Sequence, residues 1–104
     1  MRAGDLDRRI TIQSYSYERD DFGGEIPIWT DAAAVWAQVA QEGGREFLGA
    51  ETIRSERKVV FRLRWLPGIT VTHRVLYDGR EHNILEVREL GRREGLELHT
   101  TTTG

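Results

Sequence analysis

The feature that most constrains the fold is a period-two alternation of apolar and polar residues that recurs along the chain. From Val59 to Trp65, large apolar residues occupy every second position, and Arg62 and Arg64 lie between them. Successive side chains of a strand point to opposite faces, so this pattern predicts a strand with one face in a core and the other in solvent. Further strands are predicted at Arg8–Tyr15, Ile28–Thr30, Ala32–Gln41, His73–Tyr77, Arg80–Glu89 and Leu96–His99.

Short local signals predict how some of these strands are connected. Asp78-Gly79 separates two alternating runs and favours a tight type I′ hairpin, because that turn needs positive φ at both central positions. In the return strand the apolar face changes between Ile84 and Leu85, which predicts a bulge near Ile84. The segment Ser16–Pro27 is rich in charged residues and glycine, so we expect an exposed loop there.

One segment has the spacing of a helix. Phe47, Ala50 and Ile53 recur every third residue within Arg45–Ile53, directly after the pair Gly43-Gly44. Such a helix would be short and marginal alone. The chain therefore predicts a mainly β fold, a small antiparallel β-barrel or sandwich of about six or seven strands with one short helix in a long inter-strand excursion.

The length of 104 residues allows a single domain, because a chain of 12.0 kDa has room for one hydrophobic core. The tail Thr100–Gly104 carries no apolar residue and is expected to fray. The start Met1–Asp5 is followed by no apolar run, and eighteen consecutive apolar residues occur nowhere in the chain. Secretion and membrane insertion are therefore not expected.

The residue inventory argues against catalysis. The chain has no cysteine, which removes disulfides, thiolate nucleophiles and cysteine-based zinc sites. His73, His82 and His99 lie nine and seventeen positions apart, which is not the spacing of a helical metal motif, and histidines on strands are more often structural. Asp20 and Asp21 form an acidic pair that a solvated loop explains better than acid-base chemistry. We predict no catalytic residue, no metal and no cofactor.

Charge is unevenly distributed along the chain, although its formal net value is only −2. Residues 1–44 carry a net charge of −4, residues 45–64 carry +3 and residues 65–104 carry −1. A net acidic chain is unlike a general nucleic-acid binder, so contact with an acidic partner or with DNA would be local. The basic residues of the middle segment are Arg45, Arg54, Arg57, Lys58, Arg62 and Arg64.

The three tryptophans differ in their expected surroundings. Trp65 lies on the inward face of its predicted strand and is assigned to the core. Trp29 and Trp36 are candidate interface aromatics, since tryptophan is enriched in subunit contacts. They leave open a second interpretation, a free-standing small barrel that binds nucleic acid or a peptide through these rings. A metal-dependent enzyme using the histidines is a third class.

In order and spacing, these pieces resemble the phage head-tail joining proteins, also called head-closure or stopper proteins, of long-tailed phages and gene transfer agents. The resemblance spans nearly the whole chain. Its matching pieces are Met1-Arg2-Ala3-Gly4 with Leu6, Arg8-Arg9-Ile10-Thr11-Ile12-Gln13, Asp21-Phe22-Gly23-Gly24 with Trp29, Val35-Trp36-Ala37-Gln38-Val39, Gly44-Arg45-Glu46, Phe61-Arg62-Leu63-Arg64, Pro67-Gly68-Ile69, Arg74-Val75-Leu76-Tyr77-Asp78-Gly79-Arg80, Ile84 and Leu96-Glu97-Leu98.

The resemblance implies a non-enzymatic virion component. Such a protein forms a ring, a hexamer or dodecamer, between the portal-bound adaptor and the tail terminator or tail tube protein, and helps retain packaged DNA. It implies a place at the head–tail junction of a virion or gene transfer agent particle, with assembly in the bacterial host cytoplasm. Adaptor and tail-terminator roles at the same junction remain alternatives. The family's long excursion between strands corresponds here to Glu42–Lys58, which contains the predicted helix.

Two candidate surfaces follow from charge and resemblance together. The basic residues of the excursion are expected to face a neighbouring subunit, the adaptor or DNA in the channel lumen; they are Arg45, Arg54, Arg57 and Lys58. The acidic loop Tyr17–Glu25 is expected to dock onto a partner ring. Its central residues are Asp20, Asp21, Phe22, Gly23 and Gly24.

Overall fold

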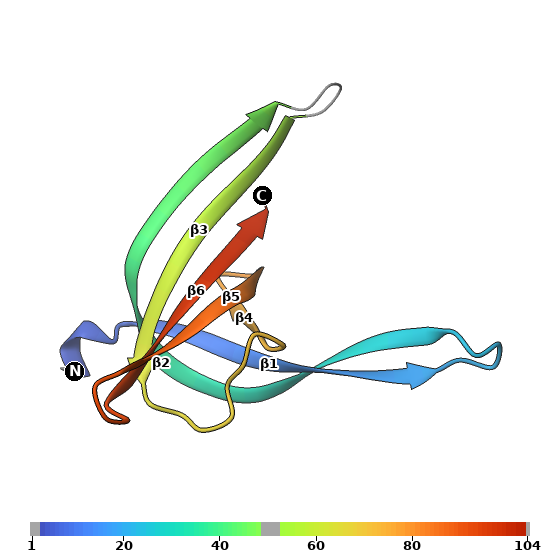
Figure 1. The fold of residues 1–104 in the computed structure, drawn as a ribbon, viewed down its shortest axis with the longest axis horizontal. Coiled ribbons are helices and arrows are strands. Elements are labelled where there is room, and N and C mark those ends of the chain that lie inside the picture. Colours follow the sequence, from blue (N-terminus) through green and yellow to red (C-terminus); the bar gives the residue numbers. More distant parts are fainter. Residues whose placement is uncertain (1–2, 49–52, 104) are drawn as a thin grey trace.

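A computed structural model of the chain describes residues 3–48 and 53–103. Almost all of the described chain is β-strand, and the only helical element in these ranges is one turn of 3-10 helix near the start (Figure 1). The elements are η1 (Ala3–Asp5), β1 (Arg8–Arg19), β2 (Glu25–Leu48), β3 (Ile53–Arg64), β4 (Arg74–Tyr77), β5 (Arg80–Leu90) and β6 (Gly95–Thr103). The mainly β expectation is confirmed.

The six strands form one antiparallel sheet that closes on itself. They hydrogen-bond in the order β1-β2-β3-β6-β5-β4, and β4 pairs back onto β1 at Thr11–Gln13, which makes a closed barrel. The last strand in the chain, β6, lies between β3 and β5. Because the sheet closes, few strand edges in the central part of the fold remain unpaired.

Alternating residues of every strand meet inside the closed sheet. Phe61 is fully buried, and its ring meets Tyr77 and His82 edge-on at 5.3 and 5.5 Å between centroids. Trp65 packs partly buried against this cluster. The expected inward face of Val59–Trp65 is thus confirmed. The buried core comprises Ile10, Ile12, Ala37, Val59, Phe61, Leu63, Val75, Ile84, Leu96 and Leu98.

Two hairpins extend far beyond the core and give the molecule its shape (Figure 1). The first arm comprises residues 14–30, the ends of β1 and β2 with their turn; the second arm comprises residues 41–48 of β2 and 53–58 of β3. The radius of gyration is 15.6 Å. A compact chain of this length has a radius of gyration of about 13 Å. In the described chain the first arm pairs with no other strand, whereas the base of the second arm is flanked by β6 as far as Glu56.

The helix predicted over Arg45–Ile53 is wrong for every described residue of that range. Arg45–Leu48 continues β2, and Leu48 pairs with Ile53 at the start of β3. Residues 49–52 lie outside the described ranges. A helix of this length is marginal, whereas a partner strand bonds both backbone groups of every second residue along the ladder. Pairing with β3 therefore overrides the three-residue apolar spacing.

The loop predicted over Ser16–Pro27 is exposed, as expected, but most of it is strand. β1 continues to Arg19 and β2 begins at Glu25, which leaves a turn of residues 20–24. Cross-strand pairing of Tyr15 with Trp29 extends the hairpin, since paired aromatics favour a ribbon even where it is solvated. Polar composition predicted exposure correctly and local conformation incorrectly.

The tail predicted to fray over Thr100–Gly104 forms the end of β6 as far as Thr103. Thr100 and Thr102 are buried, with 1% and 4% of their surface exposed. Their hydroxyls donate hydrogen bonds of 2.7 and 2.8 Å to the backbone carbonyls of Val59 and Glu81. Threonine is a strand former whose hydroxyl becomes compatible with a core once it is bonded, so absence of apolar residues did not mean absence of core contact.

The predicted hairpin turn at Asp78-Gly79 and the predicted bulge near Ile84 are both confirmed. Asp78 and Gly79 have φ values of 53° and 74°, the positive pair that a type I′ turn needs. The register of β5 against β6 shifts between Ile84 and Glu86, which places a bulge at Leu85. This bulge lets both Ile84 and Val87 face the core although they are three positions apart, while Leu85 is exposed.

Candidate functional site

The tip of the first arm is an ordered turn that presents one aromatic ring. The Asp20 carboxylate accepts hydrogen bonds from the backbone N–H groups of Phe22 and Gly24 at 2.9 and 2.6 Å. Gly23 has a φ of 80°, a conformation that glycine adopts without strain. The Phe22 side chain projects from this turn with 97% of its surface exposed. Such complete exposure of a phenylalanine has no stabilising value inside the monomer.

The sides of the first arm are apolar and acidic. Tyr15, Tyr17 and Ile26 expose 46%, 50% and 48% of their surfaces. From Tyr15 to Trp29 the chain has four carboxylates and a single arginine. Exposed apolar surface rimmed by charge is typical of protein–protein contacts. The predicted docking residues 20–24 therefore lie together at the end of an arm whose sides are also apolar and acidic.

The base of the first arm is held by a residue that we did not predict from the sequence, Arg74 on β4. Its guanidinium lies 4.0 Å from the centre of the Trp29 ring, and its Nε donates a hydrogen bond of 2.7 Å to Gln13. Its Nη1 atom forms an ion pair of 3.3 Å with Glu81. No local signal marks Arg74, because its partners lie up to 61 positions away in the chain.

The predicted basic surface divides between the two faces of the second arm. Arg45 lies on β2 and Arg54 on β3, and the adjacent β3 residues Arg57 and Lys58 point to opposite faces of the arm. Arg57 forms an ion pair of 3.2 Å with Glu42 on the neighbouring strand. Lys58 is exposed. The four candidates are therefore on the same arm, but not in one patch.

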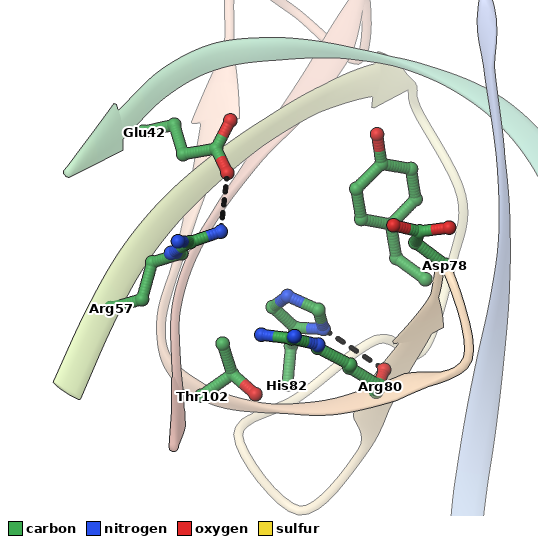
Figure 2. A pocket seen from close by; sticks show the side chains of 7 residues that line it. Glu42, Arg57, Asp78, Arg80, His82 and Thr102 are labelled. Atoms are coloured by element: carbon green, nitrogen blue, oxygen red, sulfur yellow. Dashed lines mark hydrogen bonds and ion pairs between the residues drawn. The ribbon is translucent and has the colours of Figure 1, made fainter. Parts of the chain in front are cut away.

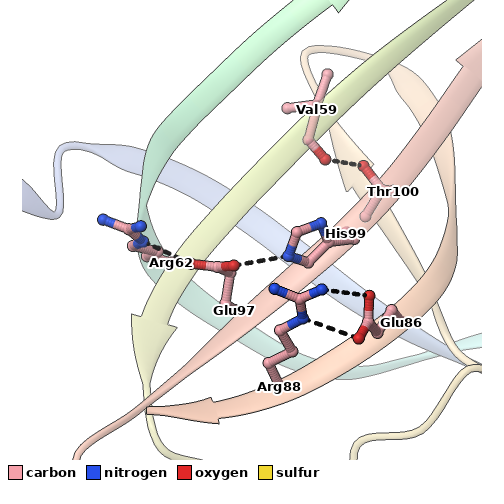
Figure 3. A network of polar contacts seen from close by, with 7 residues as sticks. All are labelled: Val59, Arg62, Glu86, Arg88, Glu97, His99 and Thr100. Atoms are coloured by element: carbon pink, nitrogen blue, oxygen red, sulfur yellow. Dashed lines mark hydrogen bonds and ion pairs between the residues drawn. The ribbon is translucent and has the colours of Figure 1, made fainter.

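Arg62, also in the basic segment, belongs to a network of ion pairs on the sheet (Figure 3). Arg62 donates a hydrogen bond of 2.8 Å to Glu97, and Glu97 lies 2.6 Å from the ring of His99. The hydrogen bond from Arg62, and then that from His99, lowers the pKa of Glu97. On the next strand Arg88 pairs with Glu86 at 2.8 Å and lowers the pKa of Glu86. These arginines have carboxylate partners within the sheet.

A small open pocket lies between the base of the second arm and the β4–β5 hairpin (Figure 2). Its volume is about 100 Å³, and His82 forms part of its lining. His82 Nδ1 lies 3.0 Å from the carbonyl of Arg80, and burial of the ring lowers its pKa. In the described ranges no group of three or more His, Asp or Glu side chains is arranged to hold a metal. The lining residues are Glu42, Arg57, Tyr77, Asp78, Arg80, His82 and Thr102.

The two candidate interface aromatics have different environments. Trp36 lies on the outside of the closed sheet, with 53% of its surface exposed and Arg9 at 5.3 Å from its ring centre. Trp29 is half-buried between Tyr15 and Arg74. Trp36 is therefore accessible to a partner, whereas Trp29 is largely engaged at the base of the first arm.

The fold and these surfaces define a class of protein before any comparison. A small closed sheet that extends two hairpin arms, one with an exposed aromatic tip, has the form of a structural protein that works through contacts with partners. The sequence matches the phage head completion protein family over residues 1–103, and the chain belongs to this family. It is a structural protein of the virion at the head–tail junction and not an enzyme.

Solved structures have the same fold. A chain in the virion of a native gene transfer agent particle is 22% identical, with a TM-score of 0.78 over 95% of this chain and 96% of that one. Protein SF1141 from Shigella flexneri 2a is 27% identical, with a TM-score of 0.68 over 98% and 96% of the two chains. Protein xkdH of the phage-like element PBSX from Bacillus subtilis is 9% identical, with a TM-score of 0.59 over 89% and 91%.

The search of curated proteins found no match. In the part of the chain that the structure describes, no helix has the length and apolar character that a membrane crossing needs.

Proposed function

We propose that this protein is the head-closure, or stopper, component that forms a ring between the portal-bound adaptor and the tail and helps retain packaged DNA. Family membership and the similarity to a chain of a gene transfer agent virion support this role. A ring also fits the energetics. Many copies on a symmetric template gain affinity through multivalency, so each copy needs only a small contact surface.

The observation that carries the proposal is the presentation of Phe22. Its ring is 97% exposed on a turn that Asp20 orders through two hydrogen bonds. Contact hot spots are commonly aromatic anchors that enter a pocket of the partner. In the proposed assembly the tip of the first arm is such an anchor and docks onto a partner ring, and the surrounding carboxylates favour a partner surface with basic groups.

The second arm has a different proposed role. Arg45, Arg54 and Lys58 lie on the strands of this arm, and we assign them to a contact with a neighbouring subunit, the adaptor or DNA in the lumen. Arg57 points to the opposite face from Lys58 and pairs with Glu42, so it contributes less to any external contact. An ion pair formed within the chain reduces the charge that is offered to a partner.

Particles produced without this protein provide the test. Purified wild-type chain added to tailless heads while they package DNA should restore tail attachment, as counted by electron microscopy, and should reduce release of DNA. Phe22→Ala should lower joining by about tenfold or more, as expected for loss of an aromatic anchor. Phe22→Leu is the matched control, because it keeps an apolar side chain at the tip and should keep most of the activity.

The same assay separates the alternative roles at the junction. Heads that retain their DNA without this protein, with tails of irregular length, would identify a tail terminator and contradict the stopper role. Heads that cannot bind the stopper of a related particle would identify an adaptor. Salt-dependent binding of the isolated chain to short DNA, with no association to heads, would favour the free-standing nucleic-acid-binding module.

A further inference from the structure

The first arm leaves the closed sheet with little support from neighbouring strands. β4 pairs with β1 only at Thr11–Gln13, and β3 pairs with β2 only from Ala37 onward. Between these limits the two strands of the arm pair only with each other. A two-stranded ribbon alone is marginally stable in water, so pairing by itself does not hold the arm in one direction.

A cluster of polar side chains lies where the arm departs from the sheet. Gln13 and Asp31 are cross-strand partners at the pair directly before the arm, and Gln13 Nε2 donates a hydrogen bond of 2.9 Å to Asp31. Gln13 is buried, with 9% of its surface exposed. The register shifts between Ile12 and Gln13, which leaves Ala32 as an extra residue in β2. A bulge bends the strand that contains it, so this is the point at which the arm changes direction.

Arg74 connects this departure point to β4. The Arg74 side chain is only 15% exposed, and its Nε donates a hydrogen bond of 2.7 Å to the carbonyl oxygen of the Gln13 side chain. The same guanidinium lies 4.0 Å from the ring centre of Trp29, which is the next residue on that face of the arm. Trp29 in turn contacts Tyr15 edge-on, with 5.2 Å between ring centroids. The Arg74 side chain therefore contacts both strands that form the arm, β1 at Gln13 and β2 at Trp29.

We propose that Arg74 is a positioning residue that sets the direction of the first arm and so presents the Phe22 tip to its partner. This inference rests on the proposed function of that tip. A prealigned arm meets its partner without an additional loss of conformational entropy, which strengthens binding without any new contact. Without the Arg74 guanidinium, the bend at Gln13 and Asp31 has no side-chain bond to β4 among the described contacts.

The cysteine-free chain allows the direction of the arm to be measured directly. Spin labels are placed at Asp21→Cys on the tip and Arg88→Cys on β5, both exposed positions, and the distance distribution is recorded by pulsed electron resonance. The otherwise unchanged chain should give one narrow distribution. Arg74→Met should give a broad one, because methionine retains the apolar stem but neither the hydrogen bond to Gln13 nor the charge over Trp29.

Arg93→Met is the matched control, since Arg93 also lies over a tryptophan, Trp65, at 5.0 Å, but away from the arm. It should leave the distribution narrow. Arg74→Lys gives a second test in case the methionine variant unfolds; it keeps the charge, loses the planar contact and should also broaden the distribution. A narrow distribution in both folded Arg74 variants would overturn the positioning role.

Joining assays with the same variants distinguish this inference from the function on which it rests. Arg74→Met should need about tenfold more protein than Arg93→Met for half-maximal joining of tails to heads, the range expected when a prealigned surface becomes mobile. If the arm loosens but joining is unchanged, Arg74 still positions the arm and the docking role of its tip fails. If the arm stays fixed while Phe22→Ala abolishes joining, the docking role holds and the inference on Arg74 fails.

Discussion

The hydroxyl of Thr100 donates a hydrogen bond of 2.7 Å to the backbone carbonyl of Val59 and so joins β6 to β3 across 41 positions of the chain (Figure 3). Thr100 is 1% exposed and Val59 is 2% exposed, so water cannot replace this bond. The end of the chain is thereby a structural part of the closed sheet. It also supports the second arm, because β6 runs beside β3 as far as Glu56.

Replacing Thr100 with valine should destabilise the fold although the two side chains have nearly the same shape. The change leaves the buried carbonyl of Val59 without its hydroxyl partner, which costs about 1–2 kcal/mol of unfolding free energy. Chemical denaturation monitored by tryptophan fluorescence measures the loss. Thr30→Val, at an exposed strand position, is the control and should change the free energy by less than about 0.5 kcal/mol. Equal stability of both variants would mean that the tail bond is unimportant.

Stability should fall in acid because of Glu97. Hydrogen bonds from Arg62 and then His99 hold the folded pKa of Glu97 below its ordinary value of 4.5. The carboxylate therefore stabilises the fold above about pH 4.5, and this contribution is lost as the pH falls through the lower folded value. Glu97→Gln should give a flatter stability profile below that pH. The control Glu86→Gln removes an exposed carboxylate, which solvent screens, and should flatten the profile less.

His82 should produce a separate pH dependence at higher pH. Burial between Phe61 and Tyr77 lowers its pKa from the ordinary 6.5, although backbone hydrogen bonds at Arg80 and Val75 oppose this effect. The unfolded chain then binds a proton more readily than the folded one, so stability is complete above about pH 6.5 and decreases as the pH falls below it. His82→Phe should remove this slope while Glu97→Gln leaves it in place. Denaturation curves across pH 5–8 compare the two, and a slope that persists in His82→Phe would contradict the assignment.

The turn at the tip of the first arm should be sensitive to a single added methyl group. A Cβ at Gly24 would lie 2.7 Å from Oδ2 of Asp20, so Gly24→Ala must displace the carboxylate that orders the turn. We expect head–tail joining to fall severalfold, with less than about 0.5 kcal/mol change in unfolding free energy, because the turn lies outside the core. Gly43→Ala is the control, since a Cβ there meets no atom within 4 Å. Equal joining by both variants would argue against a defined tip conformation.

The candidate site could be predicted from the sequence only in part. The acidic segment around Phe22 and the basic segment around Lys58 are visible as local composition, and both segments belong to exposed arms. Arg57 and Lys58 are divided between two faces because residues 53–58 form a strand, which local composition did not indicate. Arg74 could not be predicted, because a guanidinium 61 positions from Gln13 meets it only when the sheet closes.

Features that depend only on neighbouring residues could be predicted from the sequence. Alternation marked the inward face of Val59–Trp65, Asp78-Gly79 marked a hairpin, and the change of parity at Ile84 marked a bulge. Each of these rests on steric preferences within a few residues. The tertiary structure alone decided that Ser16–Pro27, Arg45–Leu48 and Thr100–Thr103 are largely strand. Their conformation comes from backbone hydrogen bonds to another strand, and local residue patterns do not specify which strand that is.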